Sequence, residues 1–308
     1  MYYLGIDGGG TKTAFALMNE EGEIISTYET SGCYYPTLGK EGIFNLLETG
    51  IMQCTKGIDL SKVVACGGIP LYGESDNLMA DLEEIKARLP IEISFVNDVE
   101  VGYYGALEFQ AGINIVAGTG SIGIGFDESG NSARSGGFGP DLGCDEGSAH
   151  YIGRSLIHKF TRQIDFREER TLLYEAMRQK INLKNDLHVM SYFLEEIQME
   201  RDKIASFSLL ANELALAGDT ECVKIFQDAA YELYLLAIGL VRQLSFQEKP
   251  IKVSYTGGVF KSGALILEPF EKLLKENEME LVKPLNTPIY GACIKARANV
   301  KNMQLPIG

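Results

Sequence analysis

Three consecutive glycines follow the first predicted strand, in the segment Asp7-Gly8-Gly9-Gly10-Thr11-Lys12-Thr13. Because glycine has no Cβ, the backbone N–H groups of such a loop can approach a ligand closely. The pattern is typical of a phosphate-binding loop, in which the Thr11 and Thr13 hydroxyls donate to phosphate oxygens. Asp7, at the end of the strand, is placed to hold Mg²⁺ directly or through water. The alternative is an ordinary glycine-rich hairpin with a capping aspartate.

A second glycine loop begins the second half of the chain, at Gly118-Thr119-Gly120-Ser121-Ile122-Gly123. It matches G-x-G-x-x-G, the fingerprint of a dinucleotide site when the loop opens a helix. Residues 124–127 instead have the pattern of a strand and a turn. We therefore interpret the segment as a second phosphate-contacting hairpin, with a simple β-turn as the alternative.

A third junction of this kind, Thr256-Gly257-Gly258-Val259-Phe260, follows a late strand. Its two glycines would let a flat nucleobase or a ribose lie against the backbone. No G-x-x-x-x-G-K-[ST] segment occurs in the chain. A nucleotide site built from these loops is therefore not of the P-loop kind.

Asp98 ends a predicted buried strand and immediately precedes a predicted helix. In that position it either caps the helix or faces a ligand. As a functional group it would accept the proton of an attacking hydroxyl as the oxygen meets a γ-phosphate.

A glycine-rich stretch, residues 136–148, carries further carboxylates near a predicted helix start. Gly136 and Gly137 supply flexible backbone, and Asp145 or Glu146 could bond sugar hydroxyls. The alternative is that Asp145 caps the following helix while Glu146 interacts with the helix dipole.

The elements that must position these residues follow the order βββαβαβ over residues 2–96. The order comprises an antiparallel meander over residues 2–30, helices over 40–56 and 76–88, and short strands at 63–66 and 91–96. After a helix over 101–107, a strand-turn-strand pattern starts again at Ile113. We therefore expect an α/β protein with two lobes, a domain from 1 to 112 and a larger, helix-rich domain from 113 to 308.

Composition limits the classes of partner. The 308 residues are 45% hydrophobic and carry a net charge of −14, with no basic stripe, which argues against nucleic acid as a partner. The N-terminus lacks the pattern of a signal peptide, and the longest apolar stretch, residues 229–244, contains charged residues. We expect a cytoplasmic protein without a membrane segment. The cysteines form no C-x-x-C pair, which argues against structural zinc.

Taken together, these segments resemble the N-acetylglucosamine kinase-like branch of the BadF/BadG/BcrA/BcrD ATPase family, in the actin/hexokinase/Hsp70 superfamily. Residues 7–13 look like the family's first phosphate loop, 118–121 like its second, and 256–260 like its adenosine loop. Asp98 falls where the family keeps its catalytic base. Residues 136–148 are similar to the family's sugar-binding stretch, GGWG…GDEGS.

The resemblance implies ATP and Mg²⁺ as cofactors, two RNase H-like domains with a central cleft for ATP and substrate, a C-terminal helix at about 288–300 that packs on the first domain, and a homodimer. It implies sugar contacts from Asp98, Thr119, Gly120, Gly136, Gly137 and Asp145. Two features depart from the family. Residues 32–36 lack the asparagine of the amino-sugar kinases, and an extra residue leaves Asp141 as an alternative to Asp145.

The sequence thus predicts phosphoryl transfer from Mg-ATP to a primary hydroxyl of an amino sugar, with N-acetylglucosamine first and N-acetylmuramic acid or glucosamine as other acceptors. One alternative is an ATPase that activates a low-potential electron-transfer partner, a role that needs thiolates gathered around an iron–sulfur cluster. The scattered cysteines disfavour it. The other is a sugar sensor without catalysis, which both phosphate loops and Asp98 disfavour.

Overall fold

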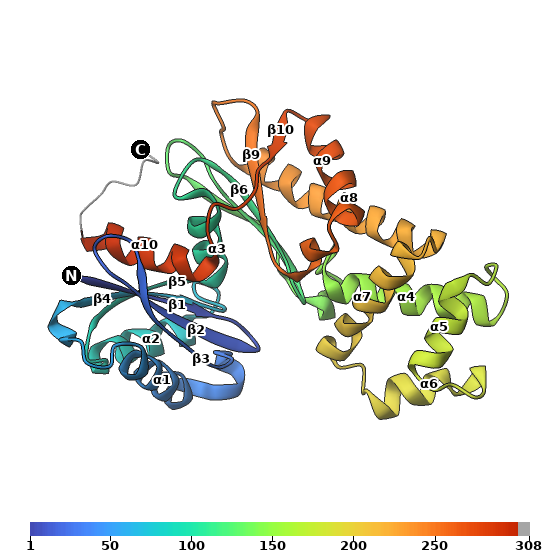
Figure 1. Cartoon of the computed structure of the whole chain (residues 1–308), viewed down its shortest axis with the longest axis horizontal. Helices are drawn as coiled ribbons and strands as arrows, with labels where there is room; N and C mark the ends of the chain where they lie inside the picture. Colours follow the sequence, from blue (N-terminus) through green and yellow to red (C-terminus); the bar gives the residue numbers. More distant parts are fainter. Residues whose placement is uncertain (301–308) are drawn as a thin grey trace. The chain divides into compact units, whose positions relative to one another are not determined.

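A computed structural model describes residues 1–300 and divides the chain into two compact units (Figure 1). Among the described residues, unit 1 contains 1–114, 124–132 and 283–300, and unit 2 contains 115–123 and 133–282. The units are therefore interleaved along the chain. A single boundary at 112/113 would assign residues 124–132 and the end of the chain to the second domain.

The first sheet has the strand order β3-β2-β1-β4-β5. The strands are β1 (Tyr2–Gly8), β2 (Lys12–Met18), β3 (Ile24–Ser31), β4 (Val63–Ile69) and β5 (Glu92–Asn97). The β1-β2-β3 meander is antiparallel, as predicted, and β4 and β5 continue the sheet in parallel with β1. The carboxyl ends of β1, β4 and β5 consequently share one edge, where Asp7 pairs with Gly68 and Gly68 pairs with Val96.

Helices cover both faces of this sheet (Figure 1). They are α1 (Tyr35–Cys54), α2 (Asp76–Arg88), α3 (Asp98–Leu107) and α10 (Pro288–Val300), with a short 3₁₀ turn, η1, at Leu60–Lys62. Leu4, Ile6, Phe15 and Leu17 of the sheet form one apolar core with Leu47 of α1 and its neighbours. Burial of these side chains is the main force that holds the unit together.

On the other face, α10 lies close to β1 and α3. A Cβ on Gly5 would come within 2.7 Å of Cys293, and a Cβ on Gly291 would overlap the carbonyl oxygen of Val101. Glycine is thus required where these elements meet, since any larger residue would separate them.

The second sheet repeats the arrangement, with the order β10-β9-β6-β7-β8. Its strands are β6 (Gly112–Ala117), β7 (Ser121–Phe126), β8 (Ser132–Gly136), β9 (Ile251–Thr256) and β10 (Met279–Leu281). In both sheets the strand that opens the domain is central and is followed by a glycine loop. The prediction of an α/β protein whose second half opens as the first did is confirmed.

The remaining helices belong to unit 2. The long ones are α4 (Ala149–Ile164), α5 (Leu172–Lys180), α7 (Arg201–Leu216), α8 (Thr220–Gln243) and α9 (Ala264–Lys275). Short segments are η2 (Pro140–Leu142), η3 (Asp186–His188), α6 (Val189–Ser191), η4 (Tyr192–Glu196) and η5 (Gly258–Ser262). Leu236 and Leu240 of α8 lie over Gly123 of β7, where an added Cβ would come within 3.0 Å of Leu240.

Two predicted boundaries were wrong. The start predicted for the helix over 40–56 agrees with the structure, because Gly39, with φ 61° and ψ −177°, breaks α1 and separates a short first turn at Tyr35 from the helix that follows. The helix predicted from residue 101 begins at Asp98, because Asn97 caps it. Strand β4 continues through Gly67 and Gly68 instead of ending there, because it stays paired with β5 as far as Asn97.

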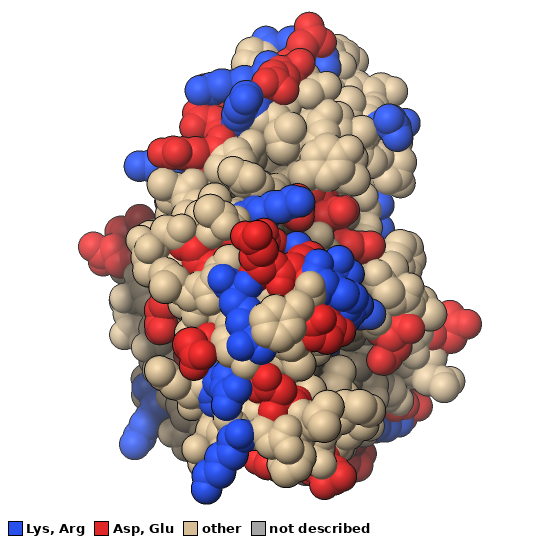
Figure 2. Space-filling view, turned by 90° about the vertical axis from the view of Figure 1, so that its right-hand side faces the viewer, with Lys and Arg blue, Asp and Glu red and all other residues tan. Residues whose placement is uncertain are grey.

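Lys and Arg are interspersed with Asp and Glu on the face shown in Figure 2. Ion pairs of the described residues include Lys159 with Glu168 at 3.0 Å and Arg178 with Asp186 at 2.8 Å. None of the helices within residues 1–300 combines the length and apolar character that a membrane crossing requires.

Candidate functional site

The first glycine loop is a tight turn between β1 and β2. Gly9 N–H donates to the Lys12 carbonyl at 2.9 Å, and Cys33 N–H donates to the Gly9 carbonyl at 2.9 Å. A Cβ on Gly8 would come within 2.7 Å of the Gly68 carbonyl oxygen, whereas a Cβ on Gly10 would meet nothing within 4 Å. Gly8 is therefore required by packing, while the backbone at Gly10 is open to a ligand.

The side chains of this loop differ in exposure. Thr11 is exposed, whereas Thr13 is fully buried and its hydroxyl has no hydrogen-bond partner among the described residues. Lys12 pairs with Glu29 at 2.7 Å in an exposed ion pair across β2 and β3. Of the two predicted hydroxyl donors, only Thr11 presents its oxygen at the surface in this conformation.

Two half-buried carboxylates, Asp7 and Asp98, lie at the shared edge of β1 and β5. Burial raises the pKa of Asp7 to about 6, and the positive charge of Lys12 opposes the rise. Burial and then the charge of Asp7 raise the pKa of Asp98 to about 7, with a smaller contribution from Glu74. The pKa values of both carboxylates are therefore raised toward neutral pH, that of Asp98 partly by the charge of Asp7.

The capping alternative for Asp98 is wrong, because Asn97 is the N-cap of α3. Its side-chain oxygen accepts from Val99 N–H at 3.2 Å, and Glu100 accepts from Asn97 N–H at 3.2 Å, which completes a capping box. Asn97 also donates to the carbonyl of Tyr72 at 2.8 Å. With the cap supplied by its neighbour, Asp98 is the first helical residue, and its carboxylate is not needed to start the helix.

Residues 32–36, where the family asparagine is missing, adjoin this site. Cys33 is fully buried, and burial followed by the charge of Asp98 raises the pKa of its thiol to about 12. Cys33 therefore stays a neutral thiol and forms an apolar neighbour to the carboxylates. Tyr34, the next residue, is 42% exposed.

The second glycine loop joins β6 to β7 and is anchored to the start of α4. Gly118 N–H donates to the Gly120 carbonyl at 2.9 Å, and the Gly118 carbonyl accepts from Ala149 N–H at 2.9 Å. His150 N–H donates to the Thr119 carbonyl at 3.3 Å. A Cβ on Gly118 would meet nothing within 4 Å, so a rigid loop again exposes open backbone.

Asp145 contacts this loop directly. It is 3% exposed, its Oδ1 accepts from Ser121 N–H at 3.3 Å, and its Oδ2 pairs with Arg201 at 2.5 Å. Ser121 Oγ donates to the Glu146 carbonyl at 2.6 Å. Residues 145 and 146 are thus tied to the loop by two hydrogen bonds with Ser121.

Capping by Asp145 is also wrong, since Ser148 caps α4. Its Oγ accepts from Tyr151 N–H at 3.1 Å. Asp141, the other candidate, is exposed. Gly136 and Gly137, which precede both, have φ of 74° and 77°, in the left-handed region that favours glycine.

The third glycine junction lies next to the second loop. Gly257 has a φ of 108°, and a Cβ there would overlap the carbonyl oxygen of Ala117, the residue before Gly118. Gly258 begins η5, and a Cβ on it would meet nothing within 4 Å. Two of the three predicted loops are therefore adjacent within unit 2.

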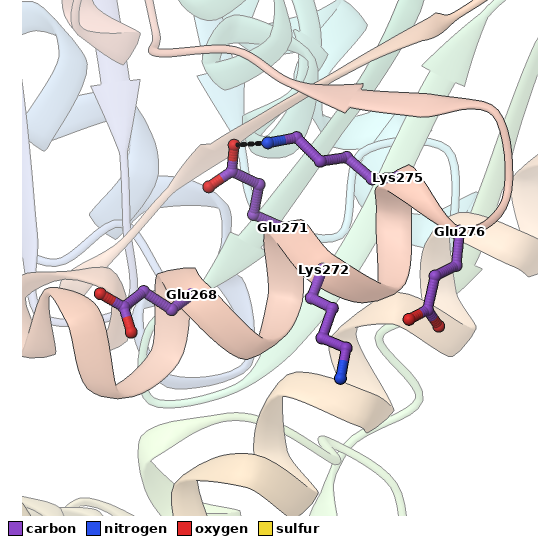
Figure 3. Close-up of a pocket in the computed structure, with 5 residues that line it drawn as sticks. All are labelled: Glu268, Glu271, Lys272, Lys275 and Glu276. Carbon is purple, nitrogen blue, oxygen red and sulfur yellow. Dashed lines mark ion pairs between the residues drawn. The ribbon is translucent and has the colours of Figure 1, made fainter.

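A shallow hollow elsewhere, on α9, carries none of the predicted residues. The hollow is lined by α9 and the residue that follows it, with the side chains of Glu268, Glu271, Lys272, Lys275 and Glu276 (Figure 3). Glu271 and Lys275 form an ion pair at 2.7 Å one helical turn apart. Such charged pairs are typical of a solvated helix face, so this hollow is not a candidate site.

Sequence reasoning missed Glu74 and Arg201. Glu74 adds negative charge near Asp98, and Arg201 is the ion-pair partner of Asp145. Neither lies in a glycine motif, and Arg201 is 56 residues from Asp145 along the chain. A buried carboxylate needs a counter-charge, so a cationic partner for Asp145 could be expected. The sequence does not show which cationic residue that partner is.

The two sheets have the same strand order, and each has a glycine loop after its first strand. This arrangement defines an α/β protein of the actin and hexokinase type, and solved structures share the fold. A candidate N-acetylglucosamine kinase from Chromobacterium violaceum has a TM-score of 0.73 at 20% identity, covering 96% of this chain and 98% of its own. A ROK family glucokinase from Streptomyces griseus, solved with glucose and AMPPNP, has a TM-score of 0.57 at 21% identity, covering 96% and 99%.

The family model of the BadF/BadG/BcrA/BcrD ATPases matches residues 4–296, and the chain belongs to this family. It is similar to the N-acetylmuramic acid/N-acetylglucosamine kinase of Clostridium acetobutylicum, with 29% identity over 96% of this chain and 98% of the relative. It is also similar to the N-acetyl-D-glucosamine kinase of Dictyostelium discoideum, with 28% identity over 96% and 97%.

Proposed function

We propose that the protein is an ATP-dependent kinase that phosphorylates a primary hydroxyl of an amino sugar, with N-acetylglucosamine as the first candidate and N-acetylmuramic acid and glucosamine next. The observation that carries the proposal is the placement of Asp7 and Asp98 at one edge of the first sheet, beside an open glycine turn, with pKa values raised to about 6 and about 7. The family and the two similar kinases support the same reaction class.

Asp98 would act as the general base. A general base is most effective when its pKa lies near the working pH, because a large fraction is then ionised and the carboxylate is still basic enough to accept a proton. Burial and then the charge of Asp7 bring the pKa of Asp98 into that range. Its carboxylate would orient the sugar hydroxyl and take its proton as the oxygen meets the phosphorus.

The residues of unit 1 fit a divalent cation. Carboxylate oxygens are the ligands that Mg²⁺ prefers, and Asp7 is a half-buried carboxylate whose pKa is raised by burial. Asp7 would hold the cation directly or through water. Bound Mg-ATP supplies the phosphoryl group and neutralises part of its charge.

Preorganised backbone donors would bind the phosphates and the nucleoside. Gly10, Gly118 and Gly258 have open space where a Cβ would stand, so their loops can lie against a ligand. Gly8, Gly9 and Gly257 shape these loops, with Thr11, Lys12, Thr13, Thr119, Gly120 and Ser121 as the other proposed contacts. Such donors stabilise charge without reorganising during the reaction.

Sugar hydroxyls would bond to Asp98, to Asp145 and to the backbone of Thr119, Gly120, Gly136 and Gly137. Between the two aspartates of the glycine-rich stretch we choose Asp145. It is buried, and its two carboxylate oxygens are held by Ser121 and Arg201, whereas Asp141 is exposed. A fixed acceptor orients a substrate better than a mobile one.

The test is ADP release by the purified protein with ATP and Mg²⁺ across a panel of sugars and amino sugars. Turnover that depends on one amino sugar supports the proposal and names the acceptor. Sugar-independent hydrolysis would instead favour an ATPase that serves an electron-transfer partner. Sugar binding without ADP release would favour a sensor, and sedimentation of the same sample would test the homodimer implied by the resemblance.

A further inference from the structure

Arg201 is an unassigned residue in contact with the proposed sugar-binding aspartate. It is the first residue of α7, and its Nη2 lies 2.5 Å from Asp145 Oδ2. The Asp145 side chain is 3% exposed, whereas the Arg201 side chain is 46% exposed. The pair therefore joins a buried carboxylate to a guanidinium that keeps part of its surface in solvent.

The backbone of Asp145 is held in an unusual conformation. Its φ is 69°, in the left-handed region that a residue with a side chain seldom adopts. Its carbonyl accepts from Ser148 N–H at 3.1 Å, and its Oδ1 accepts from Ser121 N–H at 3.3 Å. Contacts at the backbone and at each carboxylate oxygen together hold one orientation of the side chain.

Arg201 also touches the second glycine loop. A Cβ on Gly120 would overlap Arg201 Nη2 and come within 2.8 Å of Asp145 Oδ1, so both side chains lie against this glycine. His150, on α4, completes the group. Burial and then the charge of Arg201 lower the pKa of His150, so a neutral imidazole stands beside the pair and does not compete for the carboxylate.

We infer that Arg201 is the positioning residue that holds the Asp145 carboxylate in the orientation that accepts sugar hydroxyls. An ionised carboxylate only accepts hydrogen bonds, which suits the donor hydroxyls of a sugar. A buried carboxylate without a counter-charge tends to gain a proton or to turn toward solvent. The inference rests on the proposed function, in which Asp145 binds the sugar.

The experiment is a double-mutant cycle of Arg201→Gln and Asp145→Asn in the full chain, with the KM for sugar, the KM for ATP, kcat and the unfolding temperature measured for each variant. R201Q should raise the KM for sugar about tenfold or more, the loss expected for a charged hydrogen bond. Its KM for ATP should stay within about twofold of wild type. The double variant should be no worse than D145N alone, because Arg201 acts through Asp145.

Arg201→Lys and Arg154→Gln complete the design. R201K keeps the positive charge but loses the planar guanidinium, so its sugar affinity should lie between those of R201Q and the wild type. This partial recovery would show that the effect of R201Q is not a general folding defect. R154Q removes an exposed arginine near His150 and should behave as wild type.

Additive losses in the cycle, or a change mainly in the KM for ATP, would overturn the role of Arg201 while leaving the kinase reaction intact. A wild-type protein that neither binds nor phosphorylates any sugar of the panel would refute the proposed function, and the inference with it. A fall in unfolding temperature without a change in sugar KM would show a purely structural ion pair.

Discussion

At the scale of single residues, Asp98 is the proposed base and is not the cap of its helix. Asn97 and Glu100 form the capping box at the start of α3. Helix formation therefore does not explain why residue 98 is an aspartate. The start of α4 is similar, because Ser148 caps the helix while Asp145 pairs with Arg201. In both places the helix is capped by another residue, so the carboxylate is not needed as a cap.

Replacing Asp98 with Asn should therefore remove turnover without removing the nucleotide. We expect kcat to fall by about 10²–10⁴, the usual contribution of a general base. ATP binding, followed by calorimetry, should change by less than about threefold because the glycine loops are intact. A D98N variant with wild-type turnover would contradict the assignment of the base.

The charge of Glu74 gives a pH test of the same residue. Glu74 helps to raise the pKa of Asp98, so Glu74→Gln should lower it. The base works when ionised, and its activity is lost as pH falls through its pKa. The acid limb of kcat/KM, expected near pH 7 in the wild type, should therefore move to lower pH in E74Q. Glu92→Gln, on the exposed start of β5, should leave the profile unchanged.

At the scale of elements, some glycines shape the loops and others let helices approach. Gly10 belongs to the first class by its open surroundings, and Gly291 to the second by its contact with α3. The two positions can be separated experimentally, because one change should act on ligand binding and the other on folding.

Gly10→Ala should weaken nucleotide binding and leave stability unchanged. Gly10 is not among the glycines with positive φ, and its added methyl group meets no protein atom within 4 Å. The methyl group would stand where the phosphates are proposed to lie, so we expect the Kd for ATP to rise about tenfold or more. Unaltered affinity in calorimetry would remove Gly10 from the proposed phosphate loop.

Gly291→Ala should lower the stability of the protein and leave nucleotide binding unchanged. The methyl group would overlap the Val101 carbonyl and force α10 away from α3, at a cost of about 1–3 kcal/mol in the free energy of unfolding. Urea denaturation measures this loss, with G10A as the matched control in the same unit. Equal stability of G291A and wild type would mean that the two helices approach less closely than described.

At the scale of the whole molecule, the proposed cofactors should stabilise the native chain. A ligand that binds only the folded state raises its stability by about 2.7 kcal/mol at 100 times its Kd. A non-hydrolysable ATP analogue with Mg²⁺ should thus raise the unfolding temperature, and a chelator should remove most of the rise and all sugar phosphorylation. A rise that is unaffected by the chelator would count against a role for the cation.

The sequence by itself determined the class of the protein. Strand-turn-strand openings on both halves, glycines directly after strands and carboxylates at strand ends are local patterns, and local patterns can be read without contacts. They were sufficient for the α/β fold, the repeat of the two sheets and the family. The family resemblance supplied the helix at 288–300, which α10 matches in its bounds.

Only the tertiary structure decided which residues share a site. Asn97 and Ser148 make the capping hydrogen bonds of α3 and α4. An aspartate can make the same bonds, so residue type alone could not tell whether Asp98 and Asp145 were the caps. The raised pKa of Asp98 needs the register that aligns β1, β4 and β5, and the pairing of Asp145 with Arg201 joins residues 56 positions apart. Burial and charge act through space, so their effects on a carboxylate appear only once the chain is folded.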